Sequence, residues 1–559
     1  MVPVQPDRPE RYPTMEPTSA PSTLWLSIAR EAFAQEHSAA EAAAALERLG
    51  HQRGLGGGFA LGLRELISYA GAAPDPTQGA LDAELEAVAV SRRIVRPVFE
   101  ARLQAGLDEL DRQMRGKCSC SKCGRVMQSE GRPKRSWGSL LGGLLLKRRQ
   151  AECQECGRHE FPAQRAIGLS DSDFTPRLEE AVTMIAATVP YGLAVKLIAS
   201  LCGVEVSVKG IEQMVERRAE CVLQLDEQQA RACNPFDDKG LPVAEQVRPQ
   251  DAVEPSATPQ VAYMELDGVV PVTREELDDE ELTEQAKQRR EQAKQDKARG
   301  GKGRRYRIVG REVKNAVLYD GKDCVQESAE RGSILSKTYV SHLGAWLPFA
   351  LLLWAAMLRL RFDQSRLLVI LSDGAEWIRS IAQWLPIETL LILDLYHVKH
   401  RIWEVAHALY GEHSARASEW AHVQCARVEQ GQERQVVQAL RFLHPSGAQA
   451  QEKLQELIGY LENNLDRMDY PSYRARGLRV SSGTVESANF HVTGARLKLQ
   501  GMRWNADGAA QMAALRADLF TARGLSGSAV LVFLTVLAKA RTVRVNGAWE
   551  RRTREILAA

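Results

Sequence analysis

The sequence has little excess charge, no long apolar run and no sign of a secreted chain, and each absence excludes a class of protein. Among 559 residues, 73 Lys and Arg stand against 71 Asp and Glu, so any surface for nucleic acid must be local. The most apolar run, residues 345–358, is shorter than the ~18 residues that span a membrane. Residues 1–22 lack the apolar centre of a signal peptide. We therefore expect neither a membrane protein nor a secreted one.

Cysteine occurs ten times, too sparsely for a disulfide scaffold in a chain of this length. Half of the cysteines fall between Cys118 and Cys156, and we interpret the scattered remainder as small core residues. Such clustering indicates metal binding in a reducing compartment, and it predicts a cytoplasmic protein.

Two matching motifs, Cys120-x-x-Cys123-Gly and Cys153-x-x-Cys156-Gly, lie within this cluster. Each motif lets two thiolates reach one ion, and four thiolates complete a tetrahedral structural Zn²⁺ site. The glycine that follows each motif permits a tight turn. The alternatives are free or redox-active thiol pairs, and a site in which Cys118 replaces Cys120.

Two further features of the N-terminal half point to nucleic acid. The segment between the cysteine motifs is basic, with Arg148 and Arg149 among its residues, and phosphate contact or a merely solvated face would both explain it. Residues 191–202 and 208–217 are expected to form two helices joined by a short turn, with Ser207 capping the second. A helix-turn-helix gives this pattern, as does any pair of neighbouring helices.

Composition and periodicity divide the chain into segments. We expect a disordered leader (1–22), a helical N-terminal region (23–115), a zinc ribbon (116–165), a helical, helix-turn-helix-like DNA-binding region (166–233), a linker (234–260), a sheet domain (261–411) with a charged insertion (275–311), a helical insertion (412–474), a segment that carries a helix with Glu486 (475–525) and a C-terminal tail (526–559).

The sheet domain predicts an α/β fold. Three strand-like segments are followed by an alternation of helix and strand, which is typical of a mixed sheet flanked by helices. The expected strands are 261–272, 311–320, 337–342, 366–371 and 389–394, and the expected helices are 345–360 and 377–384.

Three acids of this domain occupy positions where a carboxylate is costly unless it is paired or binds a metal. Asp267 and Asp373 each end an apolar strand and precede a glycine, so on neighbouring strands they would face each other. Glu486 lies one turn into a helix, in a segment that is otherwise basic. Two aspartates and a glutamate can hold two Mg²⁺ ions, an arrangement suited to phosphoryl transfer.

Each acid also has a simpler explanation. Asp-Gly is a common turn dipeptide, and an acid in the first turn of a helix is favoured by the helix dipole. Glu265 lies on the same strand face as Asp267, and Asp394 also ends an apolar strand. These two acids are therefore rivals of Asp267 and Asp373 for the metal.

Taken together, the acids and their flanking residues resemble the catalytic blocks of bacterial insertion-sequence transposases of the DDE class. The similarity is to the Mutator-like superfamily, in the branch with an N-terminal zinc-binding cysteine domain, and it covers roughly residues 261–523. The blocks are Asp267 with its strand, Asp373-Gly374-Ala375-Glu376-Trp377-Ile378, Asp394-Leu395-Tyr396-His397, Gly483-Thr484-Val485-Glu486 and Gly501-Met502-Arg503-Trp504.

The resemblance implies a ribonuclease-H-like fold in which Asp267, Asp373 and Glu486 are catalytic and bind Mg²⁺. It implies cleavage at transposon ends followed by strand transfer, by a homodimer or higher oligomer that recognises terminal inverted repeats. It also implies a bacterial cytoplasmic protein that is associated with the nucleoid when bound to DNA. The residues expected to contact double-stranded DNA are His397, Arg496, Lys498, Arg503, Trp504, Arg148 and Arg149.

Other roles for two of these residues stay open, because His397 also fits an ordinary structural histidine and Trp504 a core tryptophan. Two other functions fit the same sequence. One is a structure-specific nuclease of the same fold without strand transfer, and the other is a transposase-derived zinc-ribbon DNA-binding regulator without catalysis.

Overall fold

A computed structural model describes residues 80–169, 172–243, 245–249, 251–254, 258–276, 306–326 and 332–521, with isolated positions between 41 and 48 and between 284 and 288. The expected leader (1–22), the start of the helical N-terminal region (23–79), most of the charged insertion (277–305) and the tail (526–559) lie outside these residues, apart from those isolated positions. The chain divides into two compact units, Met1–Glu179 with Ala199–Val204, and Glu180–Ile198 with Glu205–Ala559.

The first unit is a long helix packed on small antiparallel sheets. The helix α4 (Ala80–Gln113) lies within the predicted helical N-terminal region (23–115). Leu107 of α4 packs with Trp137 and Leu146 of a hairpin, and all three are fully buried. The strands are β2 (Lys134–Ser139) and β3 (Gly142–Lys147) in the hairpin, and β1 (Gln128–Gly131), β4 (Gln150–Glu152) and β5 (His159–Glu160) in a three-stranded sheet, followed by α5 (Pro162–Ala166).

The two expected helices that follow are present. After α6 (Pro176–Thr188), α7 (Tyr191–Cys202) ends at Gly203, whose φ of 62° is a conformation that favours glycine. The Oγ of Ser207 accepts a hydrogen bond from Gly210 N at 3.0 Å, so this residue caps the next helix as expected. That helix, α8 (Val208–Ala232), continues well beyond residue 217, so it is longer than a recognition helix requires.

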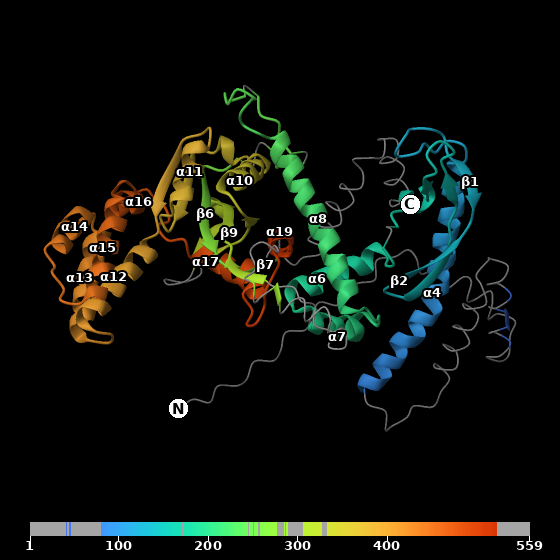
Figure 1. Ribbon diagram of the computed structural model, residues 1–559, viewed down its shortest axis with the longest axis horizontal. Coiled ribbons are helices and arrows are strands. Elements are labelled where there is room, and N and C mark those ends of the chain that lie inside the picture. Colours follow the sequence, from blue (N-terminus) through green and yellow to red (C-terminus); the bar gives the residue numbers. More distant parts are fainter. Residues whose placement is uncertain are drawn as a thin grey trace, which may run out of the picture. The chain divides into compact units, whose positions relative to one another are not determined.

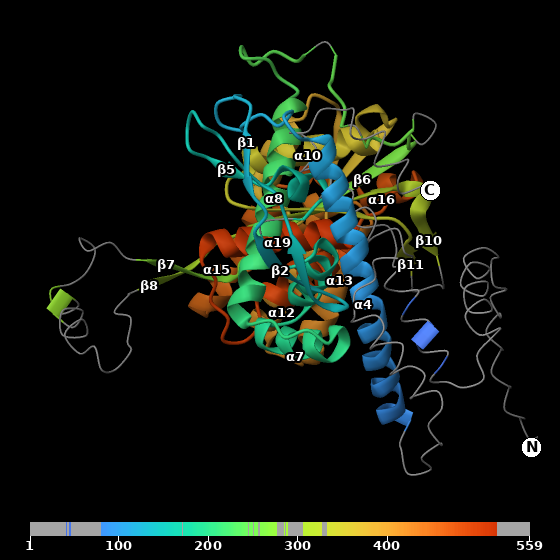
Figure 2. The same cartoon turned by 90° about the vertical axis from the view of Figure 1, so that its right-hand side faces the viewer.

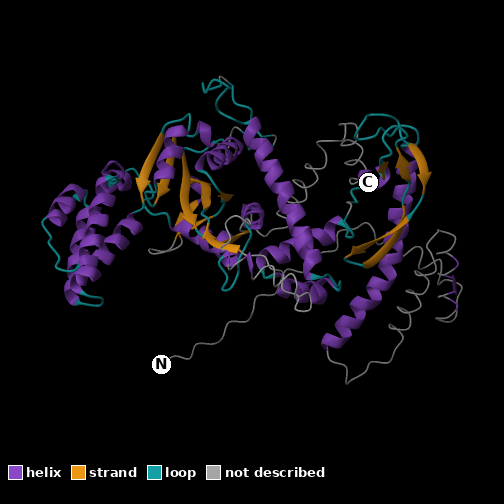
Figure 3. Cartoon of the chain, in the orientation of Figure 1, coloured by secondary structure: helices purple, strands orange, loops and turns teal. Residues whose placement is uncertain are grey.

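The second unit contains a five-stranded mixed sheet in the order β12–β9–β6–β13–β14 (Figures 1 and 3). β9 lies antiparallel to β6 and to β12, whereas β13 lies parallel to β6 and β14 parallel to β13. The expected three early strands and the later alternation are therefore confirmed. The bounds are β6 (Val261–Val269), β9 (Val313–Asp320), β12 (Thr338–Leu343), β13 (Leu367–Ser372) and β14 (Thr389–Leu393).

Alternate residues of each central strand face two different layers, because successive side chains point to opposite faces of a sheet. On β13, Leu368 and Ile370 pack with α10 (Trp346–Leu360) and α11 (Glu376–Trp384). Val369 and Leu371 pack in the other core, which includes residues of α12 (Leu395–Tyr410). The central strands are thus covered on both faces, which explains their continuous apolar runs.

The segment predicted as a helical insertion (412–474) is helical, and it packs beside α12. It consists of α13 (Ala415–Glu429), α14 (Glu433–Arg441), α15 (Ala448–Glu462) and α16 (Tyr470–Ala475), and it joins the core that contains α12 (Figure 1). Short 3₁₀ helices lie at η3 (Gly321–Asp323), η4 (Phe362–Gln364) and η5 (Leu465–Arg467).

Two hairpins and a chain of short helices complete the unit. β7 (Val272–Glu276) pairs with β8 (Tyr306–Gly310), and this hairpin, which carries the ends of the charged insertion, extends away from the sheet (Figure 2). β10 (Cys324–Gln326) pairs with β11 (Gly332–Ile334). The final helices are α17 (Gly483–Ala488), the π-helix η6 (Asn489–Gly494), α18 (Ala495–Leu497) and α19 (Ala506–Thr521). Within the described part of the chain, every helix is too short or too polar to cross a membrane.

Candidate active site and metal centres

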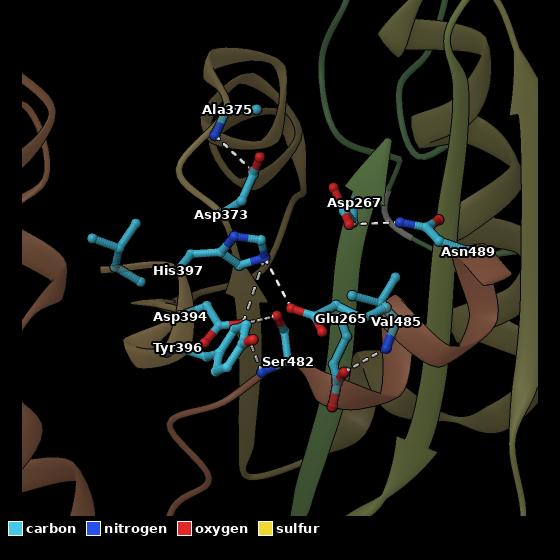
Figure 4. A network of polar contacts seen from close by, with 12 residues as sticks. Glu265, Asp267, Asp373, Ala375, Asp394, Tyr396, His397, Ser482, Val485 and Asn489 are labelled. Atoms are coloured by element: carbon cyan, nitrogen blue, oxygen red, sulfur yellow. Dashed lines mark hydrogen bonds and ion pairs between the residues drawn. The ribbon is translucent and has the colours of Figure 1, made fainter. Parts of the chain in front are cut away.

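Three aspartates form a row at the carboxyl ends of the three parallel strands. Ser372 of β13 pairs with Leu266 of β6 on one side and with Leu393 of β14 on the other. The next residue along the chain in each case is an aspartate, so the register places Asp267, Asp373 and Asp394 in line across the sheet. Figure 4 shows the side chains of Asp267 and Asp373 at a similar height, with that of Asp394 below them. This row is a consequence of the strand register, and the register could not be predicted from the sequence.

Asp267 sits in a polar network that fixes its carboxylate. Its Oδ2 accepts a hydrogen bond from Asn489 Nδ2 at 2.5 Å, and its Oδ1 accepts one from Gly268 N at 2.7 Å (Figure 4). Asn489 Oδ1 in turn accepts a hydrogen bond from Asn315 Nδ2 at 2.6 Å. The π-helix η6 begins at Asn489, and such irregular turns are often found at functional sites.

Burial, and then the charge of Asp373, raise the pKa of Asp267 to about 6. The charge of Glu486 acts in the same direction, and His397 lowers the pKa. A bound cation stabilises the ionised form of such a carboxylate, because it reduces the repulsion between the neighbouring negative charges. The electrostatics of Asp267 therefore fit a metal ligand.

Asp373 is held by a tight turn. Its Oδ1 accepts a hydrogen bond from Ala375 N at 3.0 Å, at the start of α11. Gly374 has φ of 95°, and a Cβ there would lie 2.9 Å from Leu393 Cδ1. Glycine is required at this position both by the backbone conformation and by the close approach of β14, which accounts for the Asp-Gly pair in the sequence.

Glu486 and His397 are in contact. His397 Nε2 lies 3.2 Å from Glu486 Oε1, and both side chains are partly exposed. Together with Asp394, they bring ligand atoms within 4.8 Å of one another, a grouping that could hold a metal ion. Asp267 and Asp373 are not members of that group. Their connection to Glu486 is the shared electrostatic effect on Asp267.

The two rival acids have other partners. Glu265 is fully buried, and it accepts hydrogen bonds from the Tyr319 hydroxyl at 2.5 Å and from Val485 N at 2.9 Å. Asp394 is also fully buried, and it accepts hydrogen bonds from Tyr396 N at 2.6 Å and from the backbone and hydroxyl of Ser482. These contacts with Ser482, Val485 and Asn489 had no signal in the sequence.

The basic residues expected at the site divide into exposed and buried ones. Lys498 and Arg503 are exposed. Arg496 is fully buried: its Nε donates to Ala186 O at 3.2 Å, and its guanidinium lies over the rings of Tyr191 and Trp504. A side chain with no exposed surface cannot reach a phosphate, so the expectation of DNA contact by Arg496 is replaced by a packing role.

Trp504 is half-buried and tied to the β7–β8 hairpin. Its carbonyl accepts a hydrogen bond from Arg274 N at 2.7 Å, and its own N–H donates to Val272 O at 3.3 Å. The indole is covered on one side by Arg496. This environment favours the core interpretation of Trp504 that the sequence left open.

Arg148 and Arg149 are half-buried within the first unit. The Arg148 guanidinium lies 3.5 Å from the centre of the Phe161 ring and donates to Gln164, and Arg149 Nε is 3.8 Å from Asp111 Oδ2. These contacts occupy part of each guanidinium, so phosphate contact by this pair would have to use the remaining N–H groups.

The four cysteines of the two motifs converge, as the sequence predicted. The Sγ atoms of Cys120 and Cys156 are 3.6 Å apart, those of Cys123 and Cys153 3.4 Å, and those of Cys123 and Cys156 3.8 Å. Tetrahedral Zn²⁺ with bonds of ~2.3 Å requires separations of about 3.8 Å, so the thiolates fit such an ion. Cys118 is outside the group, with its Sγ 3.2 Å from Met114 O.

The two cysteine turns are nearly identical. Gly124 N donates to Cys120 O at 2.9 Å and Gly157 N to Cys153 O at 2.8 Å, and both glycines have positive φ, 74° and 65°. The N–H groups of Cys123 and Lys122 lower the pKa of the Cys120 thiol to about 7, whereas burial and the neighbouring thiols raise the pKa of Cys123 and Cys156. A metal cation would favour the thiolate form of all four.

Comparison with known proteins gives a partial family match. The profile of an uncharacterised protein family (UPF0236) matches residues 354–530, which is less than half of the chain. No curated protein matches the sequence. Among solved structures, the chain is similar to the strand transfer complex of the Drosophila P element transposase, with 9% identity and a TM-score of 0.23. That similarity covers 68% of this chain and 95% of the other, at a score where two chains need not share a fold.

Proposed function

We propose that this protein is a DDE-type DNA transposase that uses Asp267, Asp373 and Glu486 as its catalytic carboxylates. The observation that carries the proposal is the register of β6 and β13, which aligns Asp267 with Asp373 at one edge of the sheet. The sheet order, with three antiparallel strands followed by two parallel ones, supports the ribonuclease-H-like fold that the sequence resemblance implies. On this proposal the protein is of the bacterial insertion-sequence type and similar to the Mutator-like superfamily.

The three carboxylates fit Mg²⁺, which prefers oxygen ligands. When bound, two such ions would activate the attacking oxygen and stabilise the leaving oxygen of a phosphodiester. Asp267 is oriented by Asn489 and Asp373 by its turn with Ala375, so both present preorganised oxygens. Glu486 completes the set from α17, with His397 at hydrogen-bonding distance from its Oε1. Strand cleavage would free a 3′-hydroxyl, and the same carboxylates would serve its attack on target DNA.

Double-stranded DNA is the proposed partner. Lys498 and Arg503 are exposed beyond the Glu486 helix and are suited to phosphate contact, and His397 is the DNA-facing candidate inside the site. The zinc-bound cysteine unit and the α7–α8 pair are proposed to recognise the terminal inverted repeats, in a homodimer or higher oligomer. On this proposal the protein is located in the bacterial cytoplasm and is associated with the nucleoid when it is bound to DNA.

The test is a reaction on labelled DNA that carries the sequences flanking the gene. Wild type and Asp373→Asn are compared in Mg²⁺, with DNA binding measured in parallel. The proposal predicts cleaved and joined products from wild type and none from the variant, with binding intact in both. Cleavage without joining would indicate a structure-specific nuclease, and binding without cleavage in either protein would indicate a regulator.

A further inference from the structure

The helix that carries Glu486 is too short to hold its own position. α17 has six residues, and Ser482, the residue before it, offers no side-chain cap to the first turn. Isolated helices of this length are unstable, because one turn of hydrogen bonds does not offset the conformational entropy that is lost. The orientation of Glu486 must therefore be set by contacts from other elements.

Two buried carboxylates supply those contacts. Glu265 of β6 accepts the hydrogen bond of Val485 N at 2.9 Å, in the first turn of α17 and next to Glu486. Asp394, at the end of β14, accepts the hydrogen bond of Ser482 N at 3.0 Å and also that of the Ser482 hydroxyl. The first turn of α17 is thus attached at two points to the sheet that carries Asp267 and Asp373 (Figure 4).

The attachment points lie close in sequence to the other residues of the site. Glu265 precedes Asp267 by two residues on the same strand, and Asp394 precedes His397 by three on α12. A displacement of α17 would therefore break contacts within two residues of Asp267 and within three residues of His397. From this arrangement we propose that Glu265 and Asp394 are positioning residues that fix Glu486 against Asp267 and Asp373, and that neither acid is a metal ligand.

Asp394 has a ligand atom within 4.8 Å of those of His397 and Glu486, a grouping that could hold a metal ion. The burial and the hydrogen bonds of Asp394 and Glu265 nevertheless argue against ligation by either acid. Both side chains are fully buried, and both oxygens of each carboxylate already accept a protein hydrogen bond. A metal ion at either acid would leave donors such as Tyr319 and Val485 without partners, which costs free energy in a buried place. Asp267 also accepts a hydrogen bond at each oxygen, so burial is what separates the two pairs. Asp267 and Asp373 are partly exposed at the edge of the sheet, where an ion can reach their remaining lone pairs.

Amide substitution separates the two roles, since an amide oxygen still accepts hydrogen bonds but carries no charge for a metal. Glutamine at position 265 accepts from Val485 N through its oxygen and donates to the Tyr319 oxygen through its NH₂ group. Glu265→Gln therefore preserves the attachment of α17, and Glu265→Ala removes it. Asp267→Asn is the matched control, because it removes the charge of a proposed metal ligand two residues away, while its amide oxygen can still accept the hydrogen bond of Asn489 at the end of α17.

The inference rests on the proposed function, and two measurements on the full-length, zinc-loaded protein keep the two apart. Amide hydrogen exchange of residues 482–488 reports the attachment of α17. Mn²⁺ titration, together with DNA cleavage in Mn²⁺, reports the metal site. We expect Glu265→Gln to match wild type in exchange and to retain Mn²⁺ binding, with cleavage within about threefold of wild type. Glu265→Ala should exchange faster in residues 482–488 and cleave at least about tenfold more slowly.

Asp267→Asn should lose Mn²⁺ binding and cleavage with unchanged exchange. Loss of Mn²⁺ binding in Glu265→Gln would overturn the inference, because it would make Glu265 a ligand. Unchanged exchange in Glu265→Ala would overturn it as well. If Glu265→Ala does not fold, Asp394→Ala replaces it, because alanine has no oxygen to accept the hydrogen bonds of Ser482, and faster exchange in residues 482–488 is again expected. Absence of Mn²⁺ binding and cleavage in wild type would refute the proposed function, while the exchange data would still decide whether Glu265 and Asp394 hold α17.

Discussion

His397 and Glu486 are in direct contact, with Nε2 of the imidazole 3.2 Å from Oε1 of the carboxylate. The same imidazole nitrogen lies 4.0 Å from Asp394 Oδ2. His397 therefore lies between the fully buried Asp394 and the partly exposed Glu486 of α17. Its imidazole holds the carboxylate end of Glu486.

Replacement of His397 by alanine should slow DNA cleavage more than it weakens DNA binding. Glu486 would lose the partner that orients its carboxylate, and misplacement of a catalytic group by about 1 Å can cost about 10²-fold in rate. Rates and DNA affinity are to be measured for His397→Ala and for His400→Ala, an exposed histidine on the same helix. Equal DNA cleavage rates for the two variants would contradict a role of His397 in the site.

Arg496 and Arg503 should behave in opposite ways although they are seven residues apart. Arg503→Ala and Lys498→Ala should each reduce the slope of log affinity against log salt by about 1, because each removes one phosphate contact. Arg496→Ala should instead lower the thermal midpoint, since the buried guanidinium packs on Tyr191 and bonds Ala186. Equal salt slopes for wild type and Arg503→Ala would contradict this division.

Zinc should bind with a stoichiometry of one per chain and stabilise the cysteine unit. Cys153→Ser should lose the metal and unfold at lower temperature, because Cys153 is fully buried within the four-thiolate group. Cys118→Ser is the matched control and should retain full zinc content. The measurements are metal analysis and thermal unfolding before and after treatment with a chelator. Retention of zinc by Cys153→Ser would exclude the assigned ligands.

A pair of aspartates away from the site should make stability depend on pH. Asp226 and Asp518 line a cavity of about 60 Å³ together with Arg359, and burial raises the pKa of Asp226 to about 7 and that of Asp518 to about 6. In the unfolded chain both carboxyls lose their protons near pH 4, whereas the folded chain holds them to higher pH. The contribution of these two carboxyls to stability is therefore fully present below about pH 4 and is lost as the pH rises through about 6 to 7.

Asp226→Asn removes the free-energy cost of ionising a buried carboxyl. The thermal midpoint of this variant should therefore exceed that of wild type at pH 8 and equal it near pH 4. The expected gain is about 1–4 kcal/mol, from 1.36 kcal/mol per pKa unit and the access of water to the cavity. Glu227→Gln, at an exposed neighbour on α8 that pairs with Arg231, should show no such pH dependence. A gain that is the same at both pH values would show that the effect is not electrostatic.

The sequence predicted the elements of the fold but only part of the site. Apolar runs that end at Asp267 and Asp373 were visible because central strands are buried on both faces. The sequence could not decide between Asp373 and Asp394, because both end an apolar strand and both fall at the same register position. The full burial of Asp394 and its hydrogen bonds with Tyr396 and Ser482 separate their roles.

Contacts across long sequence distances explain what was missed. Asn489 holds Asp267 across 222 residues, and Val485 reaches Glu265 across 220, so neither pairing leaves a local pattern. Arg496 was expected to bind DNA because its segment is basic, yet the chain after the π-helix turns its side chain into the core. Local charge shows that a segment is basic, but packing decides which of its side chains reach the surface.

The central claim, that Asp373 binds a catalytic metal ion, is tested most directly by a change of metal preference. Asp373→Cys replaces a hard oxygen ligand with a softer thiolate, which binds Mn²⁺ better than Mg²⁺. We predict that Asp373→Cys shows no DNA cleavage above background in Mg²⁺ and that its cleavage rate rises at least about tenfold in Mn²⁺. Asp373→Ala should not cleave DNA in either metal. Cleavage by Asp373→Cys in Mg²⁺ at the wild-type rate would contradict the claim.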